Sequence, residues 1–434
     1  MSTSSSPAKI AAELTFKHLA KVYVMLKRPT VIAVAGSVGK TSTKLMLKHL
    51  ISSEKHVSCM DDSYNNGLGL YLSVFEKKVP ANLNSPLAWS KLLLSAVTKF
   101  LLSGPDILIL EYGIDHPGDM DELIKFIRPD VSILTAATPE HMEYMKTIDA
   151  VGEEETKVIR GAKQFAVVNQ HDVDRKYLLD IDKMMYLYGE ESDHVESYYY
   201  VTRWLKTGAE INLSLDGQAY DGISVQFVSE ALIRQLVGAA LLAKKVGISD
   251  EALIKSLATA TPAASRMRLF AGLKNSVLID DTTNFSPVAG ISAIRALARI
   301  PANRHIAVLG NMHELGDYAE EGYRQVSNEF KDLDAIVLVG QMSIDMFTPL
   351  AVNCGFSLNS NLFHYGNAVE AGLFLASFLA ENDAVLVKGP FGGFYLEETV
   401  KRLLQDPADA QYLTRQSDFW IEKKRQHFGA NFDK

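Results

Sequence analysis

Residues 36–42, Gly-Ser-Val-Gly-Lys-Thr-Ser, have the composition of a phosphate-binding loop. Such a loop surrounds a phosphate with backbone N–H groups at the start of a helix, while a lysine adds positive charge and a hydroxyl can ligate Mg²⁺. The loop is one residue shorter than the G-x-x-x-x-G-K-[ST] form, and an ordinary glycine turn between a strand and a helix is the alternative interpretation. The residues expected to contact nucleotide phosphates are Gly36, Ser37, Gly39, Lys40, Thr41 and Ser42.

Two further residues stand where strands of a parallel sheet would end. Glu111 follows the apolar run 107–110, so its carboxylate is a candidate Mg²⁺ ligand beside the phosphate loop. A solvent-facing loop glutamate before Gly113 would show the same pattern. His141 follows the run 131–136 and is a candidate for catalysis or metal binding, although single histidines more often lie in packed or surface positions.

Three polar segments carry weaker signals. Residues 63–69 contain two asparagines and two glycines, which suits a backbone that approaches a ligand closely. Residues 279–284 place two carboxylates and an amide at the end of a strand, and residues 388–393 follow another strand. Each segment also fits an ordinary capped loop, so none of them indicates a function alone.

The elements expected to position these residues form an α/β fold. Apolar runs alternate with helical patterns up to about residue 170, which is typical of a parallel sheet with crossover helices. Ligands of such sheets bind beyond the carboxyl ends of the strands. The sequence therefore predicts that the polar residues meet at one sheet edge. The expected strands are 31–35, 107–111, 131–136 and 165–169.

Two more regions follow along the chain. The tyrosine-rich segment 183–230 predicts a small antiparallel annex, and a helix pair over 231–257 precedes Thr261-Pro262. A Rossmann-like α/β pattern then begins, with expected strands 277–281, 306–309, 335–339 and 384–387. We expect a short N-terminal segment, a central nucleotide-binding domain with a mostly parallel sheet, and a C-terminal domain with a helical tail; these cover residues 1–28, 29–260 and 261–434.

Composition narrows the class of ligand. The chain has 434 residues and a net charge of −8, which argues against binding nucleic acid through a basic face. It has only two cysteines, which support neither a disulfide framework nor a zinc site, so we expect a reducing, cytoplasmic location. The apolar segment 86–102 contains two lysines and predicts a buried or membrane-surface helix, not an integral membrane segment.

The order of these motifs resembles the Mur ligase family, the ATP-dependent amide ligases of peptidoglycan synthesis, and within it the type that adds D-alanyl-D-alanine. The resemblance covers residues 29–404 and includes the phosphate loop, the strand-end glutamate, the histidine and an LGxMxELG-type run at 309–316. It implies ATP and Mg²⁺ as cofactors. It also implies small-molecule substrates, namely a peptide or nucleotide-sugar peptide and an amino acid or dipeptide.

The resemblance assigns roles to individual residues. The metal ligands would be Thr41, Glu111 and His141, with Lys40 and His141 also catalytic. Further nucleotide contacts would be Asn66, Asp281 and Asn284, and substrate contacts would be Asn65, Arg266 and Lys388. A surface arginine is an equally good interpretation of Arg266.

The sequence departs from the family pattern in three places. The family uses a carbamylated lysine beyond its histidine, but Glu155 stands 14 residues after His141 and Lys157 follows it, so either Lys157 is carbamylated or the Glu155 carboxylate replaces the carbamate. Only 35 residues precede Gly36, where the family normally has a domain for the UDP-sugar; we expect this chain to lack it. The usual histidine and asparagine of the later helix are also missing, and Gln235 is among the nearest residues.

The resemblance implies a ligase that activates a carboxylate as an acyl phosphate and then forms an amide. Two alternatives stay open. The first is a ligase of the same fold with a different acceptor, such as a folylpolyglutamate or polyglutamate synthase. The second is an ATP-binding protein that has lost catalysis, which the departures at Glu155 and Lys157 would fit.

Overall fold

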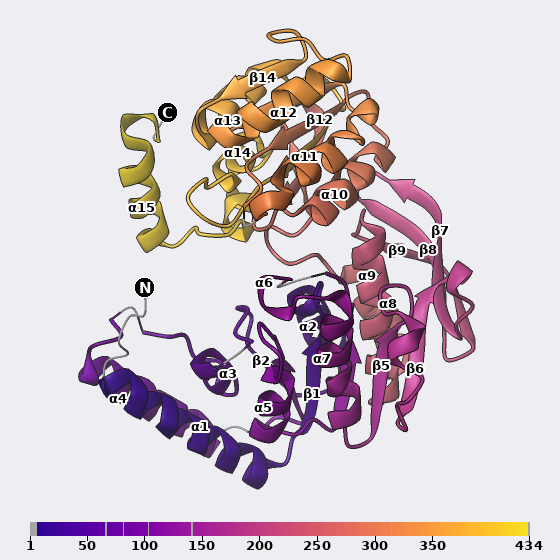
Figure 1. Ribbon diagram of the computed structural model, residues 1–434, viewed down its shortest axis with the longest axis vertical. Helices are drawn as coiled ribbons and strands as arrows, with labels where there is room; N and C mark the ends of the chain where they lie inside the picture. The colour runs from indigo at the N-terminus through magenta and orange to yellow at the C-terminus, as the bar shows by residue number, and fades with distance from the viewer. Residues whose placement is uncertain are drawn as a thin grey trace. The chain divides into compact units, whose positions relative to one another are not determined.

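The computed structural model describes residues 7–65, 67–80, 82–102, 104–139, 142–313 and 315–432. The chain divides into two compact units, and Figure 1 traces both from indigo to yellow along the sequence. The first unit contains the chain up to Tyr200 together with Ile211–Ile223 and Arg234–Ala260. The second contains Val201–Glu210, Ser224–Ile233 and the chain from Thr261 onward.

Most of the first unit is built on a nine-stranded sheet with the order β2-β3-β1-β4-β5-β6-β7-β8-β9, of which parts of β7, β8 and β9 belong to the second unit. From β2 to β7 neighbouring strands pair in parallel. Two-residue links join β7 to β8 and β8 to β9, as in hairpins, and Asp216 and Gly217 of the second link both have positive φ, which a type I′ turn requires. The strands are β1 Thr30–Ala35, β2 Val57–Cys59, β3 Ile107–Glu111, β4 Val131–Leu134, β5 Phe165–Asn169, β6 Met184–Glu190, β7 Ser197–Leu205, β8 Gly208–Leu215 and β9 Gln218–Val225.

These strands confirm the predicted α/β class and refine its annex. The four expected strands of the parallel sheet are present, and β3 and β4 are buried along their whole length. The first strand of the tyrosine-rich region, β6, pairs in parallel with β5, so the annex begins only at β7. In the register of the central strands, Val34 lies opposite Glu111 and Ala35 lies opposite Leu134. The ends of β3 and β4 therefore flank the residues that lead into the phosphate loop.

Nine α-helices lie within the chain up to Thr259, as counted over its described residues. Side-chain caps mark the starts of two of them. Thr147 caps α7 by accepting a hydrogen bond from Ala150 N, and Ser249 caps α9 by accepting one from Ala252 N. The helices are α1 Pro7–Lys27, α2 Lys40–Ile51, α3 Gly67–Ser73, α4 Pro86–Leu102, α5 Asp119–Phe126, α6 Met142–Met145, α7 Ile148–Gly161, α8 Glu230–Lys245 and α9 Asp250–Thr259.

The second unit has a six-stranded sheet with the order β10-β11-β15-β12-β13-β14. β10 pairs with β11 in an antiparallel manner, and all other pairs are parallel, so the predicted Rossmann-like pattern is confirmed with one added antiparallel edge. The strands are β10 Arg268–Gly272, β11 Ser276–Asp281, β12 His305–Leu309, β13 Ala335–Val339, β14 Leu362–Tyr365 and β15 Ala384–Lys388. The helices are α10 Pro287–Arg299, α11 Ala319–Ser327, α12 Gln341–Asn353, α13 Ala368–Phe378, α14 Glu397–Leu403 and α15 Asp418–Phe428.

The N-terminal segment and the apolar segment 86–102 both form helices, α1 and α4. In the part of the chain that the structure describes, no helix combines the length and apolar character that crossing a membrane requires. The sequence predicted a buried or membrane-surface helix at α4, and the structure shows that its burial is partial. Trp89 and Ala96 are buried, but four leucines of this helix are exposed, because only one face of α4 packs on the core.

Candidate functional site

The phosphate loop connects β1 to α2 and requires glycine at two positions. Gly36 has a φ of +129°, and a Cβ there would lie 2.3 Å from Thr135 Oγ1. Gly39 has a φ of +91°, and a Cβ there would lie 2.3 Å from Gln235 Nε2. Both conformations disfavour a side chain, so the loop backbone can turn tightly into the N-terminus of α2. A helix N-terminus approached in this way favours an anion such as a phosphate.

Side chains of the loop fix its shape. Lys40 Nζ donates hydrogen bonds to the carbonyls of Gly36 at 2.6 Å and Ser37 at 3.3 Å. Ser37 Oγ accepts a 2.8 Å hydrogen bond from Thr138 N, which ties the loop to the turn after β4. Ser42 is buried in the first turn of α2. The Lys40 ammonium is therefore held at the loop itself, where phosphate oxygens would be alternative acceptors.

Glu111, at the end of β3, is the centre of a polar cluster beside this loop. Thr41 Oγ1 donates to the Glu111 carboxylate, with oxygen distances of 3.0 and 3.1 Å. Ser63 Oγ donates to Glu111 Oε1 at 2.9 Å, and Lys44 Nζ forms an ion pair with Glu111 Oε2 at 2.9 Å. Lys44 Nζ also donates to the carbonyl of Asp62 at 2.7 Å. Two residues expected to act together, Thr41 and Glu111, are thus in direct contact.

The ion pair between Lys44 and Glu111 is almost entirely buried. The side chains are 2% and 1% exposed, respectively. Removing either charge would leave the other one buried and uncompensated, which makes this pair hard to alter without loss. The sequence analysis did not identify Lys44 as a site residue, because its pattern is that of any lysine in a helix. Its position one turn after Lys40 was the only available signal. Ser63 belongs to the polar segment 63–69, but nothing there distinguished it.

The oxygen atoms of this cluster fit a divalent cation. Among the described residues, no group of three or more His, Cys, Asp or Glu side chains could hold a metal ion by itself. However, the Thr41 and Ser63 hydroxyls and the Glu111 carboxylate lie within hydrogen-bond distance of one another, and Mg²⁺ prefers such oxygen ligands together with substrate phosphates. The donor set therefore suits a nucleotide-bound Mg²⁺ better than a metal held by protein alone.

The asparagine-containing segment lies against the strand end of Glu111. Gly113 N donates to the Asn65 carbonyl at 3.0 Å, and a Cβ at Gly113 would lie 2.3 Å from Asn65 Nδ2. This close approach explains why glycine follows the Glu111 strand end. Asn66 and His141, two other predicted site residues, lie outside the described residues.

The two candidates for the carbamate position occupy different environments on α7. Glu155 is 1% exposed. Lys157 is partly exposed and forms ion pairs with Asp121 and Glu154, both at 2.7 Å. Burial acts to lower the pKa of Lys157, but the hydrogen bonds and charges of these two carboxylates outweigh it and raise the pKa. Because carbamylation requires a neutral amine, this environment works against the modification of Lys157.

Gln235 on α8 is a residue whose role the sequence did not reveal. Its side chain is 7% exposed and lies against Gly39. Within the described part of the chain, its buried Oε1 atom has no hydrogen-bond partner. The neighbouring residue Arg234 is also buried and pairs with Asp172 and Glu190. An amide that lacks one partner is thus held directly against the phosphate loop.

The second unit brings together three of the remaining predicted residues. Lys388 Nζ forms a 2.6 Å ion pair with Asp281 and donates a hydrogen bond to the Asn284 carbonyl. Lys388 is 1% exposed, whereas Asn284 is exposed and Arg266 is half-buried. Because Lys388 is buried and already paired with Asp281, it is less accessible to a substrate than an exposed lysine would be.

Asp280, next to Asp281 in β11, is fully buried. Ser265 Oγ donates to one carboxylate oxygen at 3.1 Å and Thr282 Oγ1 donates to the other at 2.7 Å. Burial raises the pKa of Asp280 to about 7, although these two hydrogen bonds oppose the shift. The carboxyl group therefore changes its charge near neutral pH.

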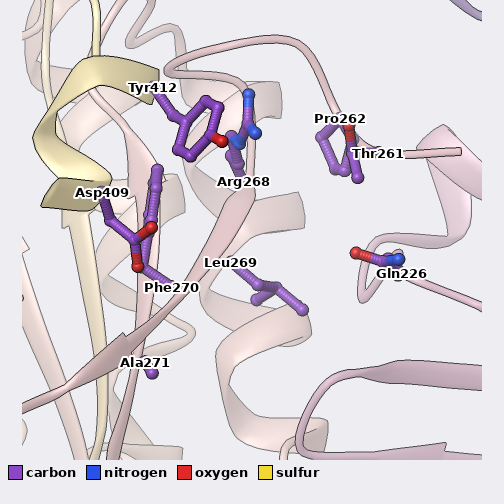
Figure 2. Close-up of a pocket in the computed structure, with 9 residues that line it drawn as sticks. All are labelled: Gln226, Thr261, Pro262, Arg268, Leu269, Phe270, Ala271, Asp409 and Tyr412. Carbon is purple, nitrogen blue, oxygen red and sulfur yellow. The ribbon is translucent and has the colours of Figure 1, made fainter. Parts of the chain in front are cut away.

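A small cavity of about 190 Å³ also lies in the second unit (Figure 2). The Arg268 guanidinium lies 4.8 Å from the centre of the Tyr412 ring, and burial lowers its pKa. None of the residues predicted to carry chemistry lines this cavity. Its lining consists of Gln226, Thr261, Pro262, Arg268, Leu269, Phe270, Ala271, Asp409 and Tyr412.

A phosphate loop on a parallel sheet, followed by a second α/β sheet, defines a nucleotide-binding protein of the P-loop type. Comparison with known families specifies it further. The profile of the Mur ligase middle domain matches residues 34–243, and that of the Mur ligase glutamate ligase domain matches residues 265–391. The chain therefore belongs to the Mur ligase family, whose members are ATP-dependent ligases that form amide bonds in peptidoglycan synthesis.

Individual relatives have low sequence identity to this chain, but their matches cover most of it. The UDP-N-acetylmuramoyl-tripeptide–D-alanyl-D-alanine ligase of Bacillus subtilis is 24% identical over 407 residues, covering 90% of this chain and 79% of that protein. The corresponding Rickettsia prowazekii ligase is also 24% identical, but the match spans only 59% of its length and 66% of this chain. The MurF ligase of Thermotoga maritima in complex with ADP has a TM-score of 0.70 at 21% identity, covering 90% of this chain and 83% of that one. This likeness confirms the fold.

Proposed function

We propose that this chain is an ATP-dependent carboxylate–amine ligase of the MurF type, which joins D-alanyl-D-alanine or a related amine to a cell-wall precursor peptide. The observation that carries the proposal is the contact of the buried Glu111 carboxylate with the Thr41 and Ser63 hydroxyls and with the buried Lys44 ammonium, directly beside the phosphate loop. Membership of the Mur ligase family and the names of the two ligases described above support the choice of reaction.

In the proposed reaction, a substrate carboxylate attacks the γ-phosphate of ATP, which yields an acyl phosphate and ADP. The amine then attacks the acyl carbon, and phosphate leaves as the amide forms. Loop N–H groups and Lys40 would stabilise the negative charge on the transferred phosphoryl group. A bound Mg²⁺ supplies charge neutralisation at the phosphates, and Thr41, Ser63 and Glu111 are the residues that would hold it.

The remaining predicted residues keep their proposed roles. We assign His141 and Glu155 to positioning near the acceptor carboxylate, and Asn65 to substrate contact. The exposed Asn284, together with Asp281 and Asn66, is proposed to contact the nucleotide. Arg266 and Lys388 are proposed substrate contacts. The proposed folding domains are residues 29–260 and 261–434, preceded by the segment 1–28.

Release of phosphate from ATP tests the proposed function. Purified protein with Mg²⁺, UDP-N-acetylmuramoyl-tripeptide and D-alanyl-D-alanine is expected to release phosphate in proportion to amide product, as followed by mass spectrometry. Lys40→Ala should abolish turnover, whereas Lys255→Ala, a change of an exposed lysine on α9, should not. If ATP stays intact with every acceptor and amine tried, the chain is a nucleotide-binding protein and not a ligase.

The choice of acceptor is tested in the same assay. Replacing the UDP-linked peptide by a folate and the dipeptide by glutamate would detect the alternative ligase with a polyglutamylating activity. Turnover with folate and glutamate alone would overturn the MurF-type assignment while preserving the acyl-phosphate chemistry. We further propose a cytoplasmic location, which agrees with Cys59 and Cys354 being free thiols.

A further inference from the structure

Two helices of the first unit, α1 and α4, carry an unusual share of its exposed apolar surface. They pack side by side, and Figure 1 shows them along one edge of this unit. The described residues expose 25 large hydrophobic side chains, and nine of these lie on α1 and α4, which together have only 38 residues. The nine are Ile10, Leu14, Val22, Met25, Leu26, Leu87, Leu94, Leu101 and Leu102.

Both helices are apolar on two opposite faces. The inner face of α1 is buried in the core through Ala12, Phe16, Ala20 and Tyr23, which recur at helical spacing. Its outer face carries Ile10, Leu14, Val22 and Met25, all exposed, with the polar residues Lys17, His18 and Lys21 between Leu14 and Val22. Packing on the core accounts for the inner apolar residues of α1 but not for the exposed ones on its outer face.

Helix α4 shows the same organisation. Trp89 and Ala96 are buried against the core, whereas Leu87, Leu94 and Leu101 are 65%, 69% and 68% exposed. These three leucines are seven residues apart and therefore form one row along the helix. The outer row of α4 thus adds to that of α1.

The two rows end at the same corner of the unit. The Tyr23 and Phe100 rings lie 5.5 Å apart, and Lys27 Nζ lies 5.9 Å from the centre of the Phe100 ring. This contact brings the C-terminal ends of α1 and α4 together. The four apolar side chains at these ends are Met25, Leu26, Leu101 and Leu102, which are 64%, 60%, 68% and 83% exposed. They form what we call the apolar corner.

The charge of this surface is opposite to that of the chain. The segments 7–28 and 86–102 contain seven lysines and arginines but one acidic residue, Glu13, in a chain with a net charge of −8. Lys21, Arg28 and Lys91 are exposed, while Lys99 is paired with Glu76. Cationic side chains around an apolar helix face are the features that bind a helix to the surface of an anionic membrane.

We propose that α1 and α4 dock this protein on an anionic phospholipid surface, with the apolar corner inserted at the boundary of headgroups and acyl chains. The helices lie in the interface and do not span it, in agreement with their length and lysine content. A second copy of the chain is a poorer occupant, because two such cationic faces repel each other.

Sedimentation with vesicles tests this docking. The full chain should bind vesicles of equal parts phosphatidylglycerol and phosphatidylcholine at low salt, bind pure phosphatidylcholine vesicles far less, and lose binding as salt increases. The double variant Met25→Ser/Leu102→Ser should lower the affinity by about tenfold or more, because it removes two inserted side chains. The matched control Leu179→Ser/Met184→Ser removes two exposed side chains of the same residue types in the same unit and should leave binding unchanged.

Charge is tested separately. Lys21→Gln/Lys91→Gln should weaken binding to anionic vesicles, whereas Lys255→Gln/Lys331→Gln, at exposed lysines elsewhere, should have little effect. Absence of binding to anionic vesicles, or equal binding to neutral ones, would overturn the proposal. So would concentration-dependent self-association in the absence of vesicles that Met25→Ser/Leu102→Ser abolishes, since the occupant would then be a second copy. Ligase activity in solution is expected to survive all four variants.

Discussion

The two units each bury a group of charged side chains, but they stabilise the carboxylates in different ways. In the second unit, Glu397 accepts from both Arg415 and Lys424, and Glu398 accepts from Lys424 and Arg402. In the first unit, the only cation that contacts Glu111 among the described residues is Lys44; hydroxyl groups supply its other contacts. Burial of charge is common to both clusters, so it cannot by itself indicate function.

The two clusters differ in whether a bound cation could replace the groups that now contact the carboxylates. The carboxylates of Glu397 and Glu398 are held by fixed cations, and Lys424 is fully buried between them. This arrangement anchors α15, the charged tail helix, to α14. The hydroxyls around Glu111 are neutral oxygen donors, which can turn toward a cation without leaving a charge unpaired. We infer that the first cluster is suited to binding a ligand and the second to stability.

The largest expected effect concerns the cluster of the second unit. Lys424→Met leaves the buried carboxylates of Glu397 and Glu398 short of a cation, which should lower the free energy of unfolding by about 3–5 kcal/mol. Urea unfolding measures this loss. The control Lys423→Met, at the adjacent exposed lysine, should change the free energy of unfolding by no more than about 0.5 kcal/mol. Equal effects of the two variants would show that the ion pairs of Lys424 with Glu397 and Glu398 do not anchor α15.

The second prediction concerns the cluster beside the phosphate loop. Glu111→Gln preserves shape but removes the charge that we propose to face Mg²⁺, so kcat should fall by about a hundredfold or more. Lys44 would then be left without its ion-pair partner, and some stability should also be lost. Glu153→Gln, at an exposed glutamate on α7, is the matched control. A variant with normal turnover and lower stability would place Glu111 with the structural cluster of the second unit.

Part of the first cluster was visible in the sequence, whereas the second cluster was not predicted. Strands β3 and β5 have the predicted boundaries, because each is a short apolar run that ends in a polar residue. The same reasoning placed Glu111 at the end of β3, next to Thr41. What the sequence indicated well was local: strands, the phosphate loop and the residues at strand ends.

The rest depended on contacts between distant residues. Lys44 is buried because Glu111 lies beside it, 67 residues later in the chain, and no local pattern records that partner. Gln235 reaches Gly39 only because α8 packs near the loop. Strand β10 was missed because its pattern is half-exposed, and α1 because both its faces carry apolar residues, which blurs the periodicity.

Asp280 is a third buried carboxylate, and it differs from the other two groups because, in the described part of the chain, only hydroxyl groups donate hydrogen bonds to its side chain. Its pKa is raised to about 7, above the value of the unfolded chain, so the folded state binds the extra proton. Stability should therefore fall as pH rises from about 4 to about 7, by at most about 1.4 kcal/mol per pH unit.

Unfolding experiments at pH 6 and pH 8 test this assignment. The asparagine of the Asp280→Asn variant cannot ionise. The free energy of unfolding of this variant relative to the natural protein should therefore be higher at pH 8 than at pH 6. Asp332→Asn, at an exposed aspartate, should show no such difference. If Asp280→Asn and the natural protein lose stability in parallel between the two pH values, another group is responsible for the pH dependence.

The smallest expected effect concerns Lys157, whose ammonium group lies between Asp121 and Glu154 in a partly exposed site. Because its pKa is raised, little neutral amine is available to react with CO₂, and we expect no carbamate there. Lys157→Ala should leave turnover within about twofold, since surface ion pairs contribute little. Turnover should also be unchanged in CO₂-depleted buffer. A large loss that depends on CO₂ would instead make Lys157 part of the site and Glu155 a buried residue of the structural kind.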